Sequence, residues 1–244
     1  MNHSKNFFEE RIASCSYPGR GLVLGLSSDG TKALQVYWIM GRSENSRNRI
    51  FHIQGGRVFT EAADPAKLED PSLIIYDAML EHDRDFIVTN GDQTRTVREH
   101  LLKGSSFETA LLSRSREPDA PNFTPRISGM TSLSEENRPL YRISVIRANQ
   151  ADPERSDHHF YCVPEIAPGS GLCVTTYLGD GSPLPSFRGE PFPVDLSGSP
   201  EDILQRYWAA LDEGNRVSLA LKVIDLENAT SHTLIQNRHT VSGA

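Results

Sequence analysis

The sequence is poor in cysteine, in lysine and in long apolar runs. Its three cysteines, Cys15, Cys162 and Cys173, are odd in number and too far apart to form a Cys-x-x-Cys pair, so we expect reduced thiols that bind no metal. The longest apolar runs, such as residues 33–40 and 219–221, are far shorter than the roughly 18 residues of a membrane span. These absences exclude a disulfide scaffold and argue against an integral membrane protein.

The signals of several common enzyme classes are also missing. No glycine is followed by lysine, which excludes the phosphate loop of P-loop enzymes, and no Gly-x-Ser-x-Gly nucleophile elbow occurs. Residues 19–25 hold three glycines, but their spacing differs from the dinucleotide fingerprint. His158 and His159 lie among acidic residues without a known ligand spacing, so we interpret that stretch as a solvated turn and expect no metal. The N-terminus lacks the apolar segment of a secretion signal, which predicts a cytoplasmic protein.

The composition is that of a globular protein with a sizeable core. The 244 residues are 37% hydrophobic and 23% charged, so one folded unit needs neither metals nor disulfides for stability. A net charge of -7 argues against nucleic-acid partners, and we expect no membrane partner either. The basic residues are 20 arginines and 5 lysines. An arginine fork suits phosphate or carboxylate binding, although genome base composition could produce the same ratio.

Turn residues between apolar segments predict a β meander in the first third of the chain. Asp29-Gly30 tolerates the positive φ of a tight hairpin, and Gly55-Gly56 and a charged turn at residues 83–85 predict two more. The strands expected here are residues 21–26, 33–40, 49–53, 57–60, 73–79 and 86–89.

Helical spacing follows these strands, and then both patterns recur. Residues 92–113 predict two helices with a break at Gly104-Ser105, and Ser199-Pro200 opens a third with an N-cap and a proline in its first turn. Residues 2–14 form either a short amphipathic helix or a frayed extension. The four prolines within residues 115–139 predict a long loop that is functional or mobile.

The remaining segments complete an α+β pattern. Further strands are expected at residues 141–147, 160–164, 172–178 and 216–224, with a second Pro- and Gly-rich loop at 179–198. Blocks of strands followed by blocks of helices predict antiparallel sheet covered by helices, because a doubly wound fold would alternate the two strictly.

The most unusual segment is residues 40–49. It combines Arg42, Arg47 and Arg49 with small amide and hydroxyl side chains and a glycine, and it carries a local charge of plus two in an acidic protein. Fixed guanidinium forks and an exposed backbone suit an anionic ligand. A solvated loop is the alternative, since exposed arginines are ordinary.

Four motifs occur in order between about residues 17 and 225. They are Tyr17-Pro-Gly-Arg-Gly, the arginine-rich segment, Tyr76-Asp77-Ala78-Met79 and Thr89-Asn90-Gly91-Asp92. In order and spacing they resemble the archaeal-type IMP cyclohydrolase family. The resemblance implies one catalytic domain at residues 17–225, with extensions at 1–16 and 226–244. It also implies a four-layer αββα sandwich with two largely antiparallel sheets, as in the N-terminal nucleophile hydrolases. Met1-Asn2 offers no Cys, Ser or Thr as an N-terminal nucleophile, unlike true amidases.

The resemblance also implies an activity. Members close 5-formamidoimidazole-4-carboxamide ribonucleotide (FAICAR) to inosine 5'-monophosphate (IMP) with loss of water, the last step of purine synthesis, without metal or organic cofactor. They are hydrolases acting on C–N bonds of cyclic amidines, and their partner is the purine nucleotide itself. A non-catalytic purine-nucleotide-binding module and an amide hydrolase of the same fold remain open, because fold does not fix function. A homo-oligomer is a further expectation.

Candidate site residues are assigned on this basis. Three arginines are expected to hold the 5'-phosphate or polarise the formyl oxygen. Tyr76, on the strand expected at residues 73–79, either donates its hydroxyl to the formyl oxygen or relays a proton, or is a core residue. Asn90 and Asp92, at the end of the next expected strand, either bind the base or the ribose or cap the helix that follows. The expected catalytic residues are Arg42, Tyr76, Asn90 and Asp92. The expected substrate-binding residues are Arg20, Arg42, Ser43, Arg47, Asn48, Arg49, Gly91, Arg126 and Tyr177, with Arg188 as a weaker candidate.

Overall fold

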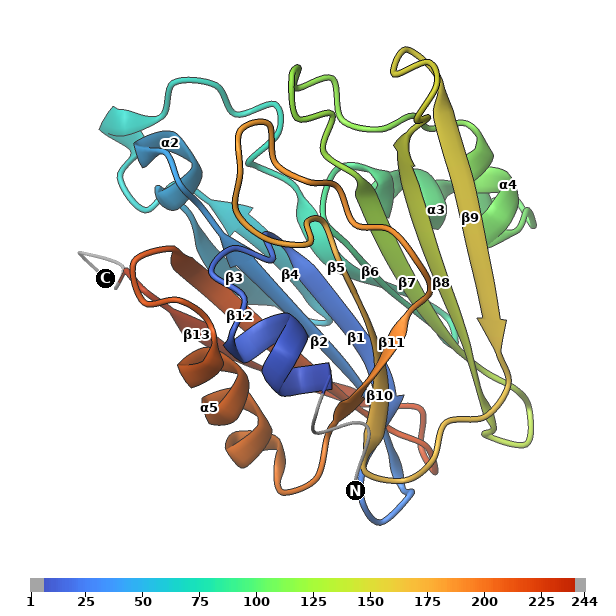
Figure 1. The fold of residues 1–244 in the computed structure, drawn as a ribbon. Helices are drawn as coiled ribbons and strands as arrows, with labels where there is room; N and C mark the ends of the chain where they lie inside the picture. The colour runs from blue at the N-terminus through green and yellow to red at the C-terminus, as the bar shows by residue number, and fades with distance from the viewer. Residues whose placement is uncertain (1–6, 240–244) are drawn as a thin grey trace.

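Two antiparallel β-sheets pack face to face in the computed structural model, which describes residues 7–239 (Figure 1). The six-stranded sheet has the order β11 (Phe192–Asp195), β10 (Ser170–Thr175), β1 (Gly21–Leu26), β2 (Lys32–Met40), β12 (Arg216–Asp225) and β13 (Ser231–Asn237). The seven-stranded sheet has the order β3 (Ile50–Gln54), β4 (Arg57–Glu61), β5 (Asp77–His82), β6 (Asp85–Thr89), β7 (Arg126–Leu133), β8 (Pro139–Ala148) and β9 (Ser156–Val163).

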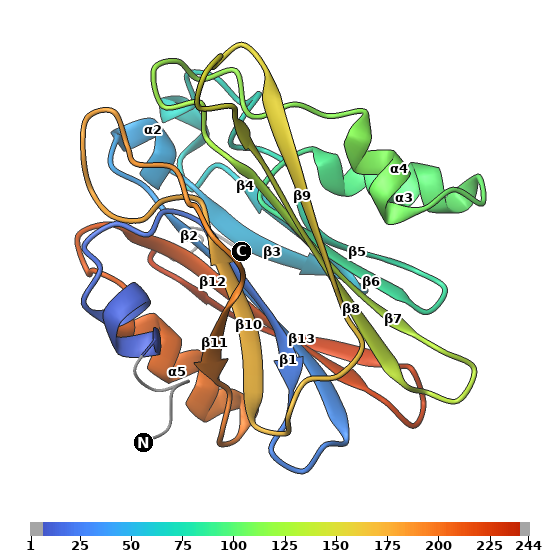
Figure 2. The same cartoon turned by 45° about the vertical axis from the view of Figure 1, so that its right-hand side comes forward.

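Helices cover the outer faces of both sheets (Figure 2). The helix α5 (Pro200–Ala210) packs on β12 and β13, and α3 (Gln93–Leu102) packs on β5 and β6 beside α4 (Phe107–Leu112). The short helix η1 (Glu9–Ala13) lies near α5, where the ring of Phe8 meets that of Tyr207 edge-on at 4.9 Å. The remaining turns are α2 (Glu44–Arg47) and η2 (Pro65–Lys67). The expected α+β class and its αββα layering are confirmed.

The core lies between the sheets and depends on close approach of β1 to β7. Leu22 and Leu24 are fully buried and face Gly129, where a Cβ would come within 3.1 Å of the Leu24 side chain. Across the same interface the Tyr141 hydroxyl donates to the carbonyl of Gly25 at 3.2 Å. Interdigitated apolar side chains of two facing sheets supply most of the burial in such a sandwich.

Most expected elements are confirmed. β1 has the expected bounds, Gly30 has the expected positive φ of 72° in the following turn, and α3 and α4 break where Gly104 stands. The cap of α5 is a full capping box, in which Ser199 accepts from the backbone of Asp202 and the Asp202 side chain accepts in return.

The expected loop at residues 115–139 is wrong in its second half. Residues 126–133 form β7, a central strand between β6 and β8. The prolines stand on either side of this strand, and its small polar residues Ser128 and Thr131 are buried within the sandwich. Small polar side chains resemble a loop in sequence, and only tertiary burial identifies them as strand.

Four other segments also differ from expectation. His158 and His159, interpreted from the sequence as part of a solvated turn, lie within β9 and pair with β8. The strand expected at residues 73–79 begins only at Asp77, since residues 73–76 form a turn. The second expected loop contains β11, and the expected C-terminal extension contains the edge strand β13 paired to β12. Residues 1–6 and 240–244 of the expected extensions lie outside the described residues. No helix in residues 7–239 is long and apolar enough to cross a membrane.

The capping box of α5 gives a direct stability test. Ser199→Ala removes the acceptor of the Asp202 backbone N–H, and we expect the free energy of unfolding to fall by about 1 kcal/mol. Urea unfolding measures the change. The control is Ser28→Ala, an exposed serine whose side chain makes no hydrogen bond within residues 7–239. Equal stability of the two variants would contradict the cap assignment.

Candidate active site

A cavity of about 380 Å³ opens where β1 begins and β2 ends. Its walls come from the segment before β1, the segment after β2, the turn before β5, and the loops that follow α4 and β10. The lining residues are Tyr17, Gly19, Arg20, Met40, Arg42, Ser43, Asn45, Ser46, Arg49, Asp70, Leu73, Ile74, Glu117, Asp119, Asn122, Thr124, Tyr177 and Leu184.

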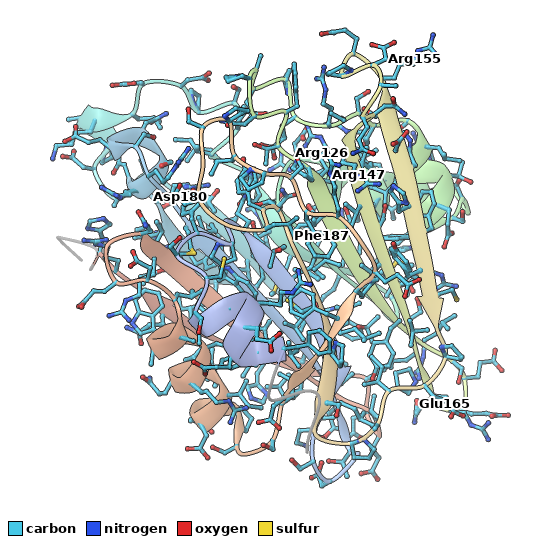
Figure 3. All side chains as sticks on the ribbon, in the orientation of Figure 1. Arg126, Arg147, Arg155, Glu165, Asp180 and Phe187 are labelled. Carbon is cyan, nitrogen blue, oxygen red and sulfur yellow. The ribbon has the colours of Figure 1, made fainter. Side chains whose placement is uncertain are left out.

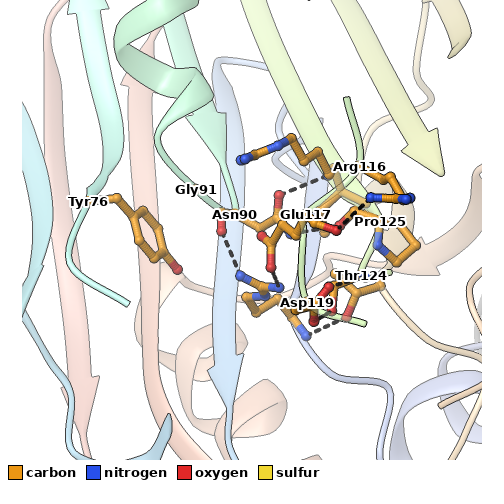
Figure 4. Close-up of polar contacts among 12 residues, drawn as sticks. Tyr76, Asn90, Gly91, Arg116, Glu117, Asp119, Thr124 and Pro125 are labelled. Carbon is orange, nitrogen blue, oxygen red and sulfur yellow. Dashed lines mark hydrogen bonds and ion pairs between the residues drawn. The ribbon is translucent and has the colours of Figure 1, made fainter. Parts of the chain in front are cut away.

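A buried ion pair forms part of the cavity wall. Arg20 donates through Nη2 to Glu117 at 2.8 Å and through Nη1 to the carbonyl of Asn90 at 2.9 Å (Figure 4). Burial alone would lower the pKa of Arg20, but the Glu117 carboxylate raises it above its usual value. Burial raises the pKa of Glu117, and Arg20 opposes that rise. The cavity therefore holds a carboxyl whose pKa is shifted towards neutral pH.

Arg49 is a second buried cation, and it has no carboxylate partner within residues 7–239. Only 3% of the residue is exposed, and its guanidinium donates to the carbonyl oxygens of Ser46 at 2.7 Å and Met40 at 3.4 Å. Burial lowers its pKa. A buried charge without a counter-charge is costly, so an anionic group bound in the cavity would be stabilised by Arg49.

Two tyrosine hydroxyls meet close to these cations. Tyr37 on β2 and Tyr76 before β5 place their oxygens 2.7 Å apart, and both residues are buried. The backbone N–H of Tyr76 donates to the hydroxyl of Thr60 at 2.9 Å. This side-chain hydrogen bond fixes the turn before β5, where a strand would use a backbone partner. Burial raises the pKa of Tyr37 well above its usual value, so its hydroxyl stays protonated. The pair can therefore supply a proton donor and acceptor side by side.

The loops after α4 and β10 are fastened together over the cavity. The Thr124 hydroxyl contacts both the Asp119 carboxylate and the Tyr177 hydroxyl, and the Tyr177 ring stacks on Tyr17 with centroids 5.9 Å apart. At the rim, Arg42 donates to Asp180, which is labelled in Figure 3, at 2.6 Å. Apart from the local contact between Thr124 and Asp119, these contacts join segments more than 50 residues apart in the chain.

Five of the residues expected from sequence line this cavity, namely Arg20, Arg42, Ser43, Arg49 and Tyr177. The short helix α2 points the side chains of the arginine-rich segment in different directions, so only some of them reach the cavity. Arg47 donates to the Gly41 carbonyl and to Asn215, each at 2.9 Å, and the Asn48 amide exchanges hydrogen bonds with the backbone of Asp64.

The other expected residues lie outside the lining. The Asn90 side chain accepts from the Ile127 backbone and donates to the Pro125 carbonyl, both at 2.9 Å, so it braces the junction before α3. Asp92 accepts from Arg126 at 2.7 Å and caps no helix through its side chain. A Cβ on Gly91 would lie 2.8 Å from the Gln93 side chain and 2.9 Å from the Arg126 guanidinium, so a larger residue there would displace these side-chain ends. Arg188 is not among the lining residues either. The proposed roles of all these residues stay predictions.

Several lining residues were not expected from the sequence. Tyr17, Glu117, Asp119 and Thr124 reach the cavity from irregular segments. Tyr37 and the expected residue Tyr76 are not among the lining residues, although their hydroxyls meet nearby. Tyr17 stands in the first of the four motifs, and the signal for the other three lining residues was the long loop at residues 115–139, where functional residues concentrate. Its Glu117 stands beside prolines and carries no motif that would distinguish it.

The buried ion pair predicts a pH-dependent loss of stability. Arg20→Met leaves Glu117 buried without its partner, and we expect the free energy of unfolding to fall by about 3–5 kcal/mol at about pH 8. The pKa of Glu117 in the folded variant then rises further above its unfolded value, so stability is lost as pH rises through it.

Urea unfolding at about pH 5 and about pH 8 tests this prediction. The loss of unfolding free energy in Arg20→Met should be smaller at the lower pH, where Glu117 takes up a proton. Adding Glu117→Gln to the Arg20→Met variant should remove the pH dependence. An equal deficit at both pH values would contradict the account of the pair.

Comparisons with known proteins bear on this geometry. Residues 17–229 match a family described as IMP cyclohydrolase-like protein. The chain is also similar to an IMP cyclohydrolase from Methanopyrus kandleri, with 32% identity over 119 residues. That match covers 47% of this chain and 58% of the relative, so it spans little more than half of the relative's length. Because the family match covers most of the sequence, the chain belongs to the IMP cyclohydrolase-like family.

Proposed function

We propose that this protein is an IMP cyclohydrolase, which closes FAICAR to inosine 5'-monophosphate and water in the last step of purine synthesis. The observation that carries the proposal is that one cavity contains both Arg49 and the Arg20–Glu117 ion pair. Arg49 is a buried cation without a carboxylate partner in residues 7–239. Family membership and the named relative support the same reaction.

The reaction joins two groups of one molecule. The carboxamide nitrogen forms a bond to the formyl carbon, and the electron pair of the C=O bond moves to the formyl oxygen, which takes up a proton. The C–O bond then breaks, and the oxygen leaves as water with a second proton, the one lost by the carboxamide nitrogen. The formamido nitrogen forms a C=N bond to the same carbon and gives its own proton to the group that first protonated the oxygen. Since the nucleophile is weak, orientation of the two groups and stabilisation of the developing oxyanion are the main contributions an enzyme can make.

Arg49 supplies the cation for this chemistry. Its guanidinium is fixed by two backbone carbonyls and faces the cavity without a counter-charge in residues 7–239. Arg42 at the rim is exposed and already pairs with Asp180, so we assign it to the outer part of the nucleotide. A fixed, desolvated cation stabilises either the 5'-phosphate or the developing oxyanion.

Glu117 and Tyr76 are the proposed proton carriers. A carboxyl with a raised pKa can accept the proton of the carboxamide nitrogen and return it to the leaving water. Tyr76 donates to the formyl oxygen, and Tyr37 holds its hydroxyl in position at 2.7 Å. Loss of a positioned donor typically costs about 100-fold or more in rate.

Turnover of synthetic FAICAR, without metal or folate, tests the proposal. We expect saturable formation of inosine monophosphate, followed by ultraviolet absorbance and chromatography. Tyr76→Phe should lower kcat by about 100-fold. Tyr161→Phe, whose hydroxyl contacts Gly189 away from the cavity, is the matched control and should keep full activity. Absence of turnover, with inosine monophosphate still raising Tm, would identify a nucleotide-binding module instead.

The pH dependence of kcat/KM tests the role of Glu117. A base must be ionised, so activity should fall as pH falls through the pKa of Glu117, which burial places above the usual glutamate value. Glu117→Gln should lower kcat/KM and remove this acidic limb. If the limb persisted unchanged in Glu117→Gln, another group would be the base.

A further inference from the structure

A second group of arginines lies outside the cavity, on the outer face of the seven-stranded sheet. Two hollows of about 440 and 470 Å³ adjoin there, and Arg57, Asp77 and Arg95 line both. Strands β4 and β5 form the floor, and α3 forms one wall. Since α3 packs on β5 and β6, it leaves the hollows open above β4.

One buried carboxylate orients two of these arginines. Asp77 is 3% exposed, and its two oxygens accept separately from Nε of Arg57 and Nε of Arg95. Arg98 in the same wall donates through Nε to the carbonyl of Glu81 at 3.3 Å. All three arginines are therefore anchored through Nε. In residues 7–239, none of their Nη atoms donates a hydrogen bond, so these N–H groups remain available to a ligand.

The carboxylates that line the hollows are mostly paired with other groups. Glu81 is occupied by Lys222 Nζ and by the Ser231 hydroxyl. Glu99 is exposed and forms no ion pair within the part of the chain that the structure describes. The second hollow adds two carboxylates, of which Glu61 lies 3.1 Å from His52 and Asp92 pairs with Arg114 and Arg126. Of the five carboxylates that line the hollows, Glu99 is therefore the one without a cationic partner in residues 7–239.

The second hollow adds an aromatic surface. Phe59 lines it, with the guanidinium of Arg57 4.1 Å from the centre of its ring. The ring of His52 on the neighbouring strand stacks on Phe59 with centroids 5.7 Å apart. A flat ring bound here would lie next to the arginine forks.

We propose that the outer arginine cluster (Arg57, Arg95 and Arg98) binds a di- or triphosphate group. A guanidinium fork engages two oxygens of a phosphate, and three separately anchored forks along two adjoining hollows can engage more than one phosphate group. The ligand is therefore a polyphosphate, either free pyrophosphate or the phosphate chain of a nucleoside di- or triphosphate whose base reaches Phe59. The turn before β5 borders both sites, since Ile74 lines the cavity of the proposed active site and Ile75 and Tyr76 line the second hollow.

Calorimetric titration with pyrophosphate and with ATP tests the proposal, since a tighter ATP complex would identify the nucleotide as the ligand. Arg95→Gln and Arg98→Gln change exposed side chains, so the fold is retained, and each should weaken binding about tenfold or more. Glu99→Gln should strengthen binding, a gain that a damaged fold would not produce. Arg155→Gln is the control with the same charge change, in the β8–β9 turn (Figure 3).

The test is independent of cyclohydrolase activity because it measures only binding. Arg49→Met changes the cavity of the proposed active site and should leave binding at the outer cluster intact. Loss of polyphosphate affinity in Arg49→Met but not in Arg95→Gln would place the ligand in that cavity and overturn the proposal. Absence of binding to the wild-type protein would overturn it as well.

Discussion

The ion pair between Arg20 and Glu117 is the contact on which the site depends. Arg20 stands immediately before β1, Glu117 follows α4, and the second bond of Arg20 reaches the carbonyl of Asn90 at the end of β6. One guanidinium thus ties the six-stranded sheet to the seven-stranded sheet and to the loop that closes the cavity. Burial makes each partner dependent on the other, since neither charge has water to replace it.

The buried part of the cavity holds more cations than carboxylates, although the protein as a whole is acidic. Within the described chain, Arg20 and Arg49 are both buried there, whereas Glu117 is the buried carboxylate beside them. The surplus cation is stabilised by backbone carbonyls only, and its charge is not screened as an exposed one would be. An anionic substrate entering the cavity completes the charge balance, so binding energy and catalytic electrostatics come from the same residue.

The sequence predicted what local rules determine. The Asp29-Gly30 hairpin and the Ser199 cap follow from residues close in the chain, and both are confirmed. Strand β7 was missed because Ser128 and Gly129 are typical of loops, and the burial that places them in a central strand comes from neighbouring layers. The site was only partly predicted, because local patterns reveal some of its residues and long-range contacts determine the others. Arg49 lies in a recognisable segment, whereas Glu117 gains its role only from a partner 97 residues away.

A crystal structure with bound inosine monophosphate would test the central claim most directly. The account predicts the nucleotide in the cavity of about 380 Å³, with an anionic or carbonyl oxygen on the Arg49 guanidinium and the purine edge within hydrogen-bond reach of Glu117 or Tyr76. A nucleotide bound elsewhere, with Arg49 and Glu117 untouched, would contradict it.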